Sequence, residues 1–571
     1  MADTAIKDGG SGAPDARPGA VPPRGAAVAT LADYCLALAA ALTVVLVTDI
    51  HYLLSQPYWL DEAWVADSLR APLSLVPRLS SSTPLAWTLL LRLVPVGGLQ
   101  RARLVPLAFY GLTVGCGYLL GRELRLTRFT AGLLTAGAVL LSPAMLARGD
   151  LKQYTAEAFS AVLVWLLVAR LENDWTRRRL IALGLVTSVG CLLASTVILT
   201  GCAALGCLGL ECLIRRRWRR FAELAVATVG MLVIFGVIYL VVLKPRINGQ
   251  LAYYWRPNYL PGNESNGLSF LHVELHDLAP YLAFVHHAGT ITLLLVAVLA
   301  LGGMAALAMG GRLALAALLP VTVALVIVAS AAKIYPFGDE RTSTFWLVMV
   351  PVLMAIGIAA VIAWATGRIA RGWLGWAVAL AATAVVLGSW ALVNKDWINQ
   401  PAVAINVQNP YAQVTYVEAH WRPGDVIVVN EEASYAFAYY YKIPASAYPT
   451  VTYAANGFIP TYPDTPWVIV ATNRDAPTIT DAVQHAEDLI AAEPAAHRGR
   501  IWIIRDHVAP EEAEFWQYAL AGSHLTTITM GRFNGRPQES LLVVRPTLHL
   551  ATSALPGSAS DPWQPMLSVN P

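Results

Sequence analysis

The chain is organised around residues 56–64, which read QPYWLDEAW and follow the first long apolar run. Two adjacent carboxylates in this stretch, Asp61 and Glu62, lie among three aromatic residues. A helix of about 20 apolar residues is long enough to cross the hydrocarbon core of a membrane. We therefore expect the carboxylate pair a few residues beyond a membrane surface.

The composition of the chain indicates a membrane protein. Its 571 residues are 56% hydrophobic and only 13% charged, whereas a soluble domain carries roughly 25% charged residues. Such a deficit means that lipids cover much of the surface. The formal net charge of +3 is too small to indicate a nucleic-acid partner. The sequence thus predicts a polytopic α-helical protein of the cell (plasma) membrane.

Eleven apolar runs are expected to span the membrane, after an N-terminal segment (residues 1–27) whose Gly, Pro, Ala and Asp content predicts disorder. A further run, residues 84–99, is short and carries Arg92 near its middle, so it can either span or lie in the interface. The eleven expected spans are 29–50, 104–121, 129–147, 153–171, 180–195, 196–214, 221–243, 281–303, 313–332, 343–365 and 373–393.

Loop charges decide between these two topologies. If residues 84–99 lie in the interface, the arginine-rich loops fall on the same side as the N-terminus, and short basic loops stay in the cytoplasm. The first loop (51–103) and the C-terminal region then face outward. The arginines concerned are Arg122, Arg125, Arg128, Arg177, Arg178, Arg179, Arg215, Arg216, Arg217, Arg219, Arg220, Arg312, Arg368 and Arg371.

The C-terminal part has a different composition and predicts a separate extracytoplasmic domain over residues 400–546. Short β-rich runs alternate there with helical patterns, which is typical of an α/β domain with a largely parallel sheet. Residues 547–571 are rich in Pro, Ser and Gly and predict an extended tail. The expected strands are 425–430, 467–472, 501–505 and 541–545, and the expected helices are 433–441, 479–492 and 510–520.

The Asp61-Glu62 pair is the first candidate for chemistry. A carboxylate at a boundary between water and lipid is partly desolvated, which raises its pKa and makes it a better base. The alternative is that the pair forms only a solvated turn or a helix cap.

At this point the sequence resembles the integral-membrane GT-C glycosyltransferases, in the branch of bacterial protein O-mannosyltransferases and lipid A aminoarabinose transferases. The resemblance covers about residues 50–365 well and the rest loosely. Its motifs are Asp61-Glu62-Ala63 after the first span, LQRARLVP at 99–106, Ser142-Pro143 followed by 148–154, Arg341 before a span containing Pro351, and RPGDVIVV at 422–429.

The resemblance implies a sugar donor carried on a polyprenyl phosphate, with Asp61 as catalytic base and Glu62 orienting or supporting it. The aminoarabinose transferases have an acidic-basic pair where this chain reads Ser82-Thr83-Pro84. A site for a divalent metal built on that acid is therefore in doubt, and we assign no metal ligands and no cofactor.

A second cluster comprises Asp150, Lys152 and Tyr154, in the turn before the fourth expected span. Asp150 is a candidate second acid or acceptor-binding group, with Tyr154 beside it, and Lys152 a candidate partner of the donor phosphate. The alternative for Asp150 is to cap the helix that follows.

Arg341 and Lys333 flank a late outer turn and are further candidates for binding the phosphate. The guanidinium fork of an arginine suits bidentate contact with phosphate. The alternatives are snorkelling at a span end or ion pairing within the turn.

A third group lies in the loop 244–280, where His272, Glu274 and His276 alternate. On a strand these three residues would share a face and could form a metal site. The alternatives for this aromatic-rich loop are an interfacial position or stacking against a sugar.

The leading hypothesis is transfer of a sugar from the polyprenyl-phosphate donor to an acceptor of the cell envelope, a glycan, lipid or protein, on the outer face of the membrane. Two other hypotheses remain: a lipid or polyprenyl-linked-sugar flippase, and a non-catalytic envelope assembly protein. Transporters place ionisable residues near the bilayer midplane. Here the polar candidates gather on one side, which favours the enzyme.

Overall fold

The structure is a computed structural model, and it describes most of the chain between residues 24 and 546. The expected tail, 547–571, and residues 1–23 of the N-terminal segment lie outside the described residues. The described ranges are 24–80, 83–94, 100–124, 129–246, 254–282, 290–369, 373–399, 410–441, 459–462, 464–494, 498–523, 525–531 and 541–546.

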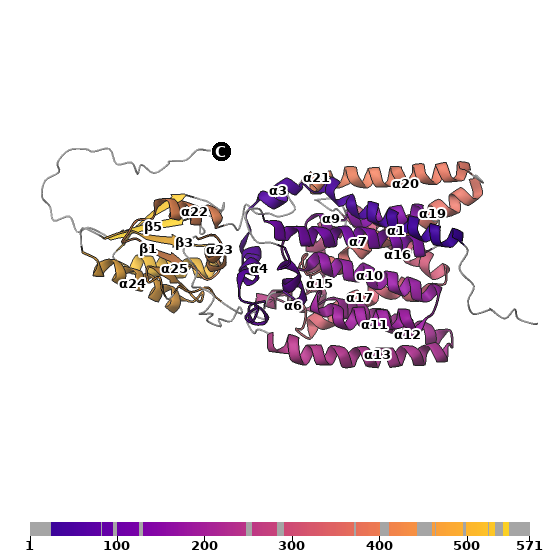
Figure 1. The fold of residues 1–571 in the computed structure, drawn as a ribbon, viewed down its shortest axis with the longest axis horizontal. Helices are drawn as coiled ribbons and strands as arrows, with labels where there is room; N and C mark the ends of the chain where they lie inside the picture. The colour runs from indigo at the N-terminus through magenta and orange to yellow at the C-terminus, as the bar shows by residue number, and fades with distance from the viewer. Residues whose placement is uncertain are drawn as a thin grey trace, which may run out of the picture.

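Long helices packed side by side form the larger part of the molecule (Figure 1). A helix is found at each of the eleven expected spans. They are α1 (Arg24–Leu42), α7 (Leu104–Glu123), α8 (Thr130–Leu140), α10 (Tyr154–Asn173), α11 (Arg177–Val189), α12 (Val197–Ile214), α13 (Trp218–Ile238), α16 (Thr290–Met309), α17 (Leu313–Ala331), α19 (Met349–Ile369) and α20 (Trp373–Val393).

Eight helices in the described part of the chain are long and apolar enough to cross a membrane. The apolar helical stretches Leu31–Val47 and Thr130–Leu140 are shorter, and α11 begins with three arginines. Helix α1 starts at Arg24, so the last four residues of the segment expected to be disordered are helical.

Short helices fill the connections between the long ones. The run 84–99 contributes only α6 (Leu85–Leu91), whose seven residues rise about 10 Å, too little to cross a core of about 30 Å. The others are α2 (Val44–Val47), α3 (Ile50–Ser55), α4 (Leu60–Arg70), α5 (Val76–Leu79), η1 (Arg101–Arg103), α9 (Pro143–Leu146), η2 (Gly190–Leu192), η3 (Tyr239–Leu243), η4 (Lys244–Arg246), η5 (Arg256–Asn258), α15 (Gly267–Leu282), α18 (Thr344–Leu347) and α21 (Lys395–Asn399).

Small residues allow the membrane helices to pack closely, as is common where helix association depends on van der Waals contact. Helices α16 and α19 illustrate this, because a Cβ added at Gly303 would lie 2.0 Å from the carbonyl oxygen of Leu353. The largest core cluster joins buried residues of α7, α10, α12 and α17. The candidate residues at the bundle end are therefore supported by a rigid helical frame.

The C-terminal region forms a five-stranded sheet in the order β2-β1-β3-β5-β4. The three strands β2, β1 and β3 are parallel, whereas β5 runs antiparallel to both β3 and β4. The sheet is therefore mixed, and the largely parallel sheet expected from sequence describes only three of the strands. Their bounds are β1 (Val426–Val429), β2 (Val468–Val470), β3 (Ile501–Ile504), β4 (Leu525–Gly531) and β5 (Leu541–Pro546).

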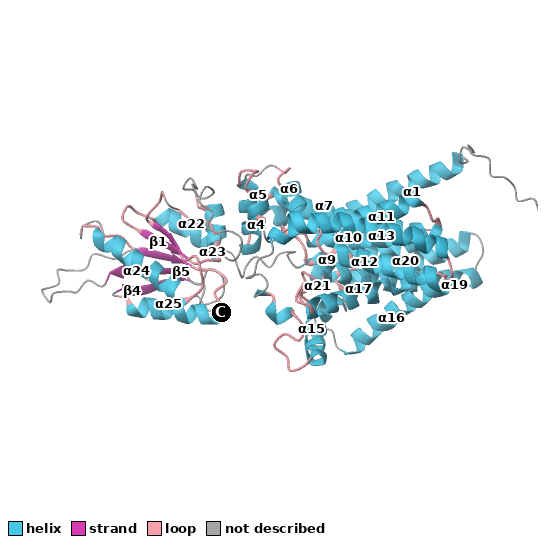
Figure 2. Cartoon of the chain, turned by 90° about the horizontal axis from the view of Figure 1, so that it is seen from below, coloured by secondary structure: helices cyan, strands magenta, loops and turns pink. Residues whose placement is uncertain are grey.

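Helices cover both faces of this sheet (Figure 2). Alternate strand residues separate the two cores: Val426 and Ile501 pack with α24 (Ala476–Ala492) and α25 (Pro510–Gly522). Ile427 and Trp502 pack on the other face with α22 (Tyr411–His420) and α23 (Ala433–Tyr440). The strands are buried on both faces, which explains their continuous apolar runs.

The α/β region meets the helical bundle through α23, which packs against α4 of the first loop. The Trp64 and Tyr435 rings stack with centroids 5.1 Å apart, and Arg70 donates a 2.7 Å hydrogen bond to the carbonyl of Tyr439. Helix α4, which carries Asp61 and Glu62, is thus held between the two parts of the molecule.

Candidate active site

Asp61 lies in the first turn of α4, with its carboxylate between two cations. Its Oδ2 accepts a 3.0 Å hydrogen bond from Arg341 Nη1, and its Oδ1 is 3.6 Å from Lys152 Nζ. The side chain keeps 18% of its surface exposed. Three residues expected in the site, taken from loops far apart in sequence, therefore meet at one point.

The pKa of Asp61 is lower than usual, whereas the sequence analysis expected it to be raised. Burial does raise the pKa of this carboxyl, but the ammonium of Lys152 and the guanidinium of Arg341 lower it by more. That expectation was wrong because sequence alone showed the desolvation and not the two cations. In this structure the carboxylate is ionised at neutral pH.

Glu62 is fully buried and forms an ion pair with Arg103, which is also fully buried. Arg103 Nε donates to Glu62 Oε1 at 2.8 Å, and its other guanidinium nitrogens donate to the carbonyls of Leu53, Gln56 and Pro57. The pair ties the start of α4 to the chain that leaves the first span. Both carboxylate oxygens of Glu62 are thus engaged by Arg103, in the interior of the protein.

Arg341 is presented by a tight turn. Gly338 has a φ of 99°, and a Cβ there would lie 1.6 Å from a carboxylate oxygen of Glu274, so only glycine fits. Asp339 accepts from the backbone N–H of Arg341 at 3.0 Å, and its Oδ2 lies 3.5 Å from Arg341 Nε. Two carboxylates thus orient one guanidinium, whose side chain is 18% exposed.

Asp150 and Lys152 are both buried beside this cluster. Burial raises the pKa of Asp150 to about 6, although the guanidinium of Arg148 opposes the rise. Asp150 does not cap the following helix, because the cap position of α10 is Gln153. The helix-cap alternative for Asp150 is therefore excluded. Lys152, two residues further on, has its Nζ 5.0 Å from the centre of the Trp64 ring.

Tyr154 opens α10 and is buried. Its ring lies 5.8 Å from the guanidinium carbon of Arg148, which also approaches Glu340 Oε1 at 3.7 Å. The turn 147–154 thus delivers Asp150, Lys152 and Tyr154 to the same region as Asp61.

Lys333 does not join the cluster. It follows the C-cap of α17 in the left-handed region, with a φ of 57°, and its side chain is exposed. Among the described residues, no hydrogen bond or ion pair links it to Asp61 or Arg341.

His272, Glu274 and His276 lie on helix α15 and not on a strand, so the shared face that alternation would give them is absent. The described part of the chain contains no group of three or more His, Cys, Asp or Glu side chains placed to hold a metal ion.

Several residues of the site were missed by sequence reasoning because they lie far from the motifs. Tyr254 interacts with Arg341 and Asp61 from the loop before α15. From the α/β region, His507 lowers the pKa of Asp61, and Asp61 raises that of Glu432. No motif indicated these three residues. One signal was available in the sequence, the adjacent acids Glu431 and Glu432 directly after the expected strand 425–430.

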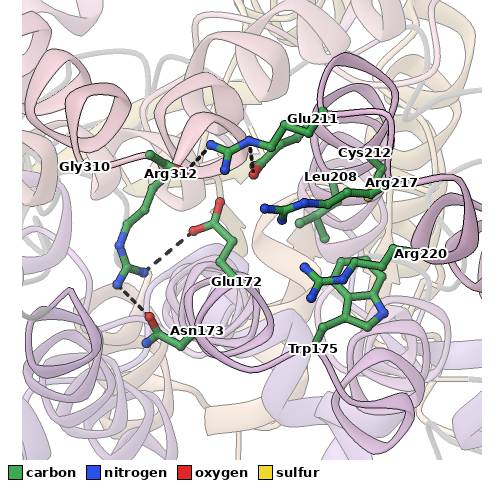
Figure 3. Close-up of a pocket in the computed structure, with 12 residues that line it drawn as sticks. Glu172, Asn173, Trp175, Leu208, Glu211, Cys212, Arg217, Arg220, Gly310 and Arg312 are labelled. Atoms are coloured by element: carbon green, nitrogen blue, oxygen red, sulfur yellow. Dashed lines mark hydrogen bonds and ion pairs between the residues drawn. The ribbon is translucent and has the colours of Figure 1, made fainter. Parts of the chain in front are cut away.

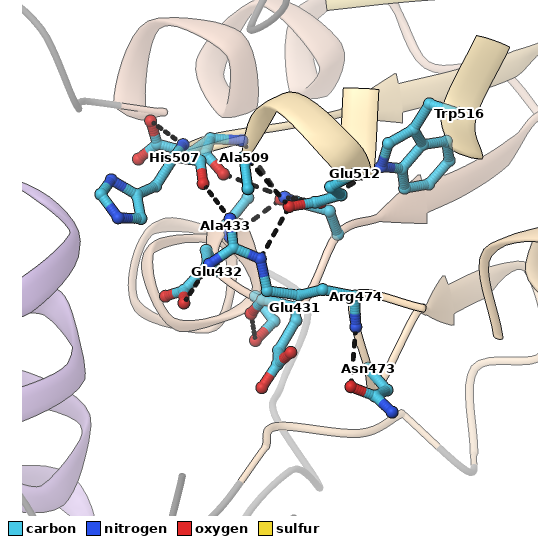
Figure 4. Close-up of polar contacts among 12 residues, drawn as sticks. Glu431, Glu432, Ala433, Asn473, Arg474, His507, Ala509, Glu512 and Trp516 are labelled. Atoms are coloured by element: carbon cyan, nitrogen blue, oxygen red, sulfur yellow. Dashed lines mark hydrogen bonds and ion pairs between the residues drawn. The ribbon is translucent and has the colours of Figure 1, made fainter. Parts of the chain in front are cut away.

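Arg474 organises this α/β side of the site (Figure 4). It pairs with Glu512 at 2.8 Å and with Glu432 at 3.3 Å, and donates to the carbonyl of His507 at 2.6 Å. His507 has a φ of 49°, a conformation uncommon for residues other than glycine. The pKa of Glu432 is raised to about 8, chiefly by burial. The α/β region therefore offers an acid and an imidazole toward Asp61.

No protein-family model matches this sequence, and no curated protein matches it. Among solved structures, the chain is similar to apo ArnT from Cupriavidus metallidurans, with 14% identity and a TM-score of 0.50, over 91% of this chain and 98% of that one. At this identity the likeness shows the fold alone. It confirms the expected architecture: a polytopic helical membrane region followed by a C-terminal α/β region.

Two further solved structures are similar at lower scores. ArnT from Cupriavidus metallidurans bound to undecaprenyl phosphate has 15% identity and a TM-score of 0.49, over 93% of this chain and 100% of that one. An oligosaccharyltransferase from Archaeoglobus fulgidus, in complex with Zn and sulfate, has 11% identity and a TM-score of 0.47, over 83% of this chain and 68% of that one.

Proposed function

We propose that this chain is a glycosyltransferase that moves a sugar from a polyprenyl-phosphate donor to a hydroxyl of a cell-envelope acceptor. The observation that carries the proposal is the Asp61 carboxylate held between Arg341 and Lys152 at the bundle end. One small cluster thus contains two cations that can stabilise an anionic leaving group and a carboxylate that can accept a proton. The GT-C fold and the first-loop motif support the same class.

In the proposed reaction the acceptor oxygen attacks the anomeric carbon as the bond from that carbon to the phosphate oxygen breaks. The electron pair of the broken bond stays on the departing polyprenyl phosphate, whose added negative charge Arg341 and Lys152 balance. The acceptor proton passes to Asp61. Because attack and departure occur on opposite faces of the carbon, the configuration inverts.

The lowered pKa of Asp61 fits this reaction if the donor changes its surroundings. A donor phosphate that takes contacts from Arg341 and Lys152 draws their positive charge away from the carboxylate. The pKa of Asp61 then rises toward that of a stronger base. The base is therefore activated only when the donor is bound.

The remaining residues fit supporting roles. Asp150, with a pKa of about 6, is a second acid that can hold or release a proton near neutral pH, and Tyr154 lies beside it. In this proposal the acceptor is contacted by Glu432 and His507, which interact with Asp61 from the α/β region.

The experiment is an assay of purified protein with a panel of radiolabelled polyprenyl-phosphate sugars, comparing wild type with Asp61→Asn. Asp49→Asn is the matched control, since it removes an exposed acid from the neighbouring α3. We expect transfer by wild type and the control, and a loss of about 10²-fold or more in Asp61→Asn. Transfer by neither protein, together with sugar-independent lipid movement in liposomes, would support a flippase instead.

A further inference from the structure

A polar cavity lies at the other end of the bundle, where α10, α12, α13 and α17 meet (Figure 3). Its volume is about 180 Å³, and four arginines and two glutamates line it. Figure 1 shows the connection between α12 and α13 at the end of the bundle away from the α/β region. The cavity is thus separate from the Asp61 cluster. Its charged lining residues are Glu172, Glu211, Arg215, Arg217, Arg220 and Arg312.

The two glutamates are already paired with two of the arginines. Glu211 Oε1 lies 3.1 Å from Arg215 Nε, and its Oε2 accepts a 3.1 Å hydrogen bond from the backbone of Ala314. Glu172 Oε2 lies 3.7 Å from Arg312 Nη1. These contacts hold the wall of the cavity together and neutralise that wall.

Arg217 and Arg220 supply positive charge beyond this balance. Neither has a carboxylate partner among the described residues, and both guanidinium groups point into the cavity in Figure 3. Arg220 is aimed by Trp175, whose ring centre lies 5.3 Å from its guanidinium carbon. Two arginine forks converging on a partly enclosed space provide bidentate contacts for a phosphate group.

The acids limit what can bind there. A second phosphate would find no further unpaired arginine among the described residues of the lining, because Glu211 already pairs with Arg215 and Glu172 with Arg312. A cavity of about 180 Å³ leaves room for one phosphate with a small substituent. The two remaining arginines can therefore hold a single phosphate.

The helix that leaves this cavity is suited to a lipid chain. The span Trp218–Leu243 has a mean hydropathy of 2.7, and only 6% of it is buried. Val226, Val229 and Val233 are exposed along it. A phosphate held by Arg217 and Arg220 at the start of α13 would therefore have its attached chains beside an open apolar surface. Basic residues next to a membrane helix attract anionic lipids in the same way.

We propose that Arg217 and Arg220 bind the single phosphate of an anionic lipid head group, with the acyl chains along α13. This site is independent of the proposed sugar transfer, because it shares no residue with the Asp61 cluster. Free phosphate has the same chemistry as the head group, so the experiment separates the two sources.

The test measures retention of radiolabelled phosphatidylglycerol by the full-length protein in detergent, with inorganic phosphate as the second probe. The variant is Arg217→Gln/Arg220→Gln. The matched control is Arg216→Gln/Arg219→Gln, which removes the same charge from exposed residues that do not line the cavity. We expect the lipid concentration that gives half-maximal retention to rise about tenfold in the variant and less than twofold in the control.

A third variant, Arg217→Lys/Arg220→Lys, keeps the charge but loses the forks, and should retain an intermediate affinity. Equal retention of lipid by wild type and the glutamine variant, with both eluting as folded protein, would overturn the site. Binding of inorganic phosphate that phosphatidylglycerol does not displace would overturn the lipid as its occupant.

Discussion

At the scale of single residues, the site depends on how two cations are shared. Arg341 and Lys152 contact Asp61 in this structure, and in the proposed reaction they contact the phosphate. Arg341 has the better geometry for a phosphate because its fork is already oriented by Asp339. Among the basic residues, loss of Arg341 should therefore reduce stabilisation of the departing phosphate, and with it the transfer rate, the most.

Arg341→Lys keeps the charge but loses the bidentate geometry, so we expect the transfer rate to fall about tenfold, and about 10²-fold or more in Arg341→Gln. Lys333→Gln is the control, since this exposed residue makes no contact with the cluster and should change the rate less than twofold. Initial rates at saturating acceptor measure the effect. An unchanged rate in Arg341→Gln would remove this residue from the proposed site.

Asp150 predicts a pH dependence of stability. Its pKa is about 6 in the folded protein against an ordinary 3.8, so the folded state holds the proton more tightly than the unfolded state. The contribution of Asp150 to the free energy of unfolding is therefore fully present below about pH 3.8 and is lost as the pH rises from there through about 6. Asp150→Asn cannot ionise, so its Tm should exceed that of wild type at pH 7.5, by a margin that shrinks at pH 4.5. A margin that is the same at both pH values would contradict the raised pKa.

At the scale of elements, helix α4 depends on one buried ion pair. Arg103 connects Glu62 of α4 with three carbonyls of the preceding segment. Removing one partner of a buried pair leaves an uncompensated charge, which costs about 3–5 kcal/mol. The position of Asp61 therefore depends on two residues that need not touch a substrate.

Glu62→Gln should lower the Tm and reduce transfer, and Glu62→Gln/Arg103→Met should recover part of the stability because no charge is then left buried. The control is Asp33→Asn, which breaks the partly exposed pair with Arg122 and should cost about 1 kcal/mol or less. Thermal unfolding of the detergent-solubilised protein measures all three. A double variant less stable than the single one would show that the charge itself is not the cause.

Element prediction succeeded where the periodicity was strong. The long apolar runs and the strands buried on both faces were recognised because each reads as a continuous apolar pattern. The edge strand β4, which reads LTTITMG, was missed because an edge strand pairs on one side only and need not be uniformly apolar. Helix α15 was taken for a loop because His, Glu and Asp interrupt its apolar residues.

At the scale of the whole molecule, the two polar regions lie at opposite ends of the bundle. The Asp61 cluster on α4 lies at the end covered by the α/β region, and the arginine-rich cavity lies at the other end, where α12 connects to α13 (Figure 1). We propose that the arginine-rich end is cytoplasmic, as the basic loops indicate. The α/β region would then lie outside the cell.

This orientation is tested by labelling in whole cells with a membrane-impermeant maleimide, after the six native cysteines are replaced. Asp481→Cys, on an exposed position of α24, should react in intact cells. Arg219→Cys, in the first turn of α13 at the arginine-rich end, should react only after the cells are broken. Labelling of Arg219→Cys in intact cells would reverse the topology and place Asp61 on the cytoplasmic side.

The long membrane helices and the acid of the first loop could be recognised from sequence, because hydrophobic periodicity and loop charge are properties of neighbouring residues. Which charges meet could not be recognised, because it depends on the packing of distant segments. Asp61 and Arg341 are 280 positions apart, and their contact lowers a pKa that local burial alone would raise. The pairing of Glu62 with Arg103 and the approach of His507 likewise depend on packing between distant segments, since Coulomb interactions follow distance in space and not along the chain.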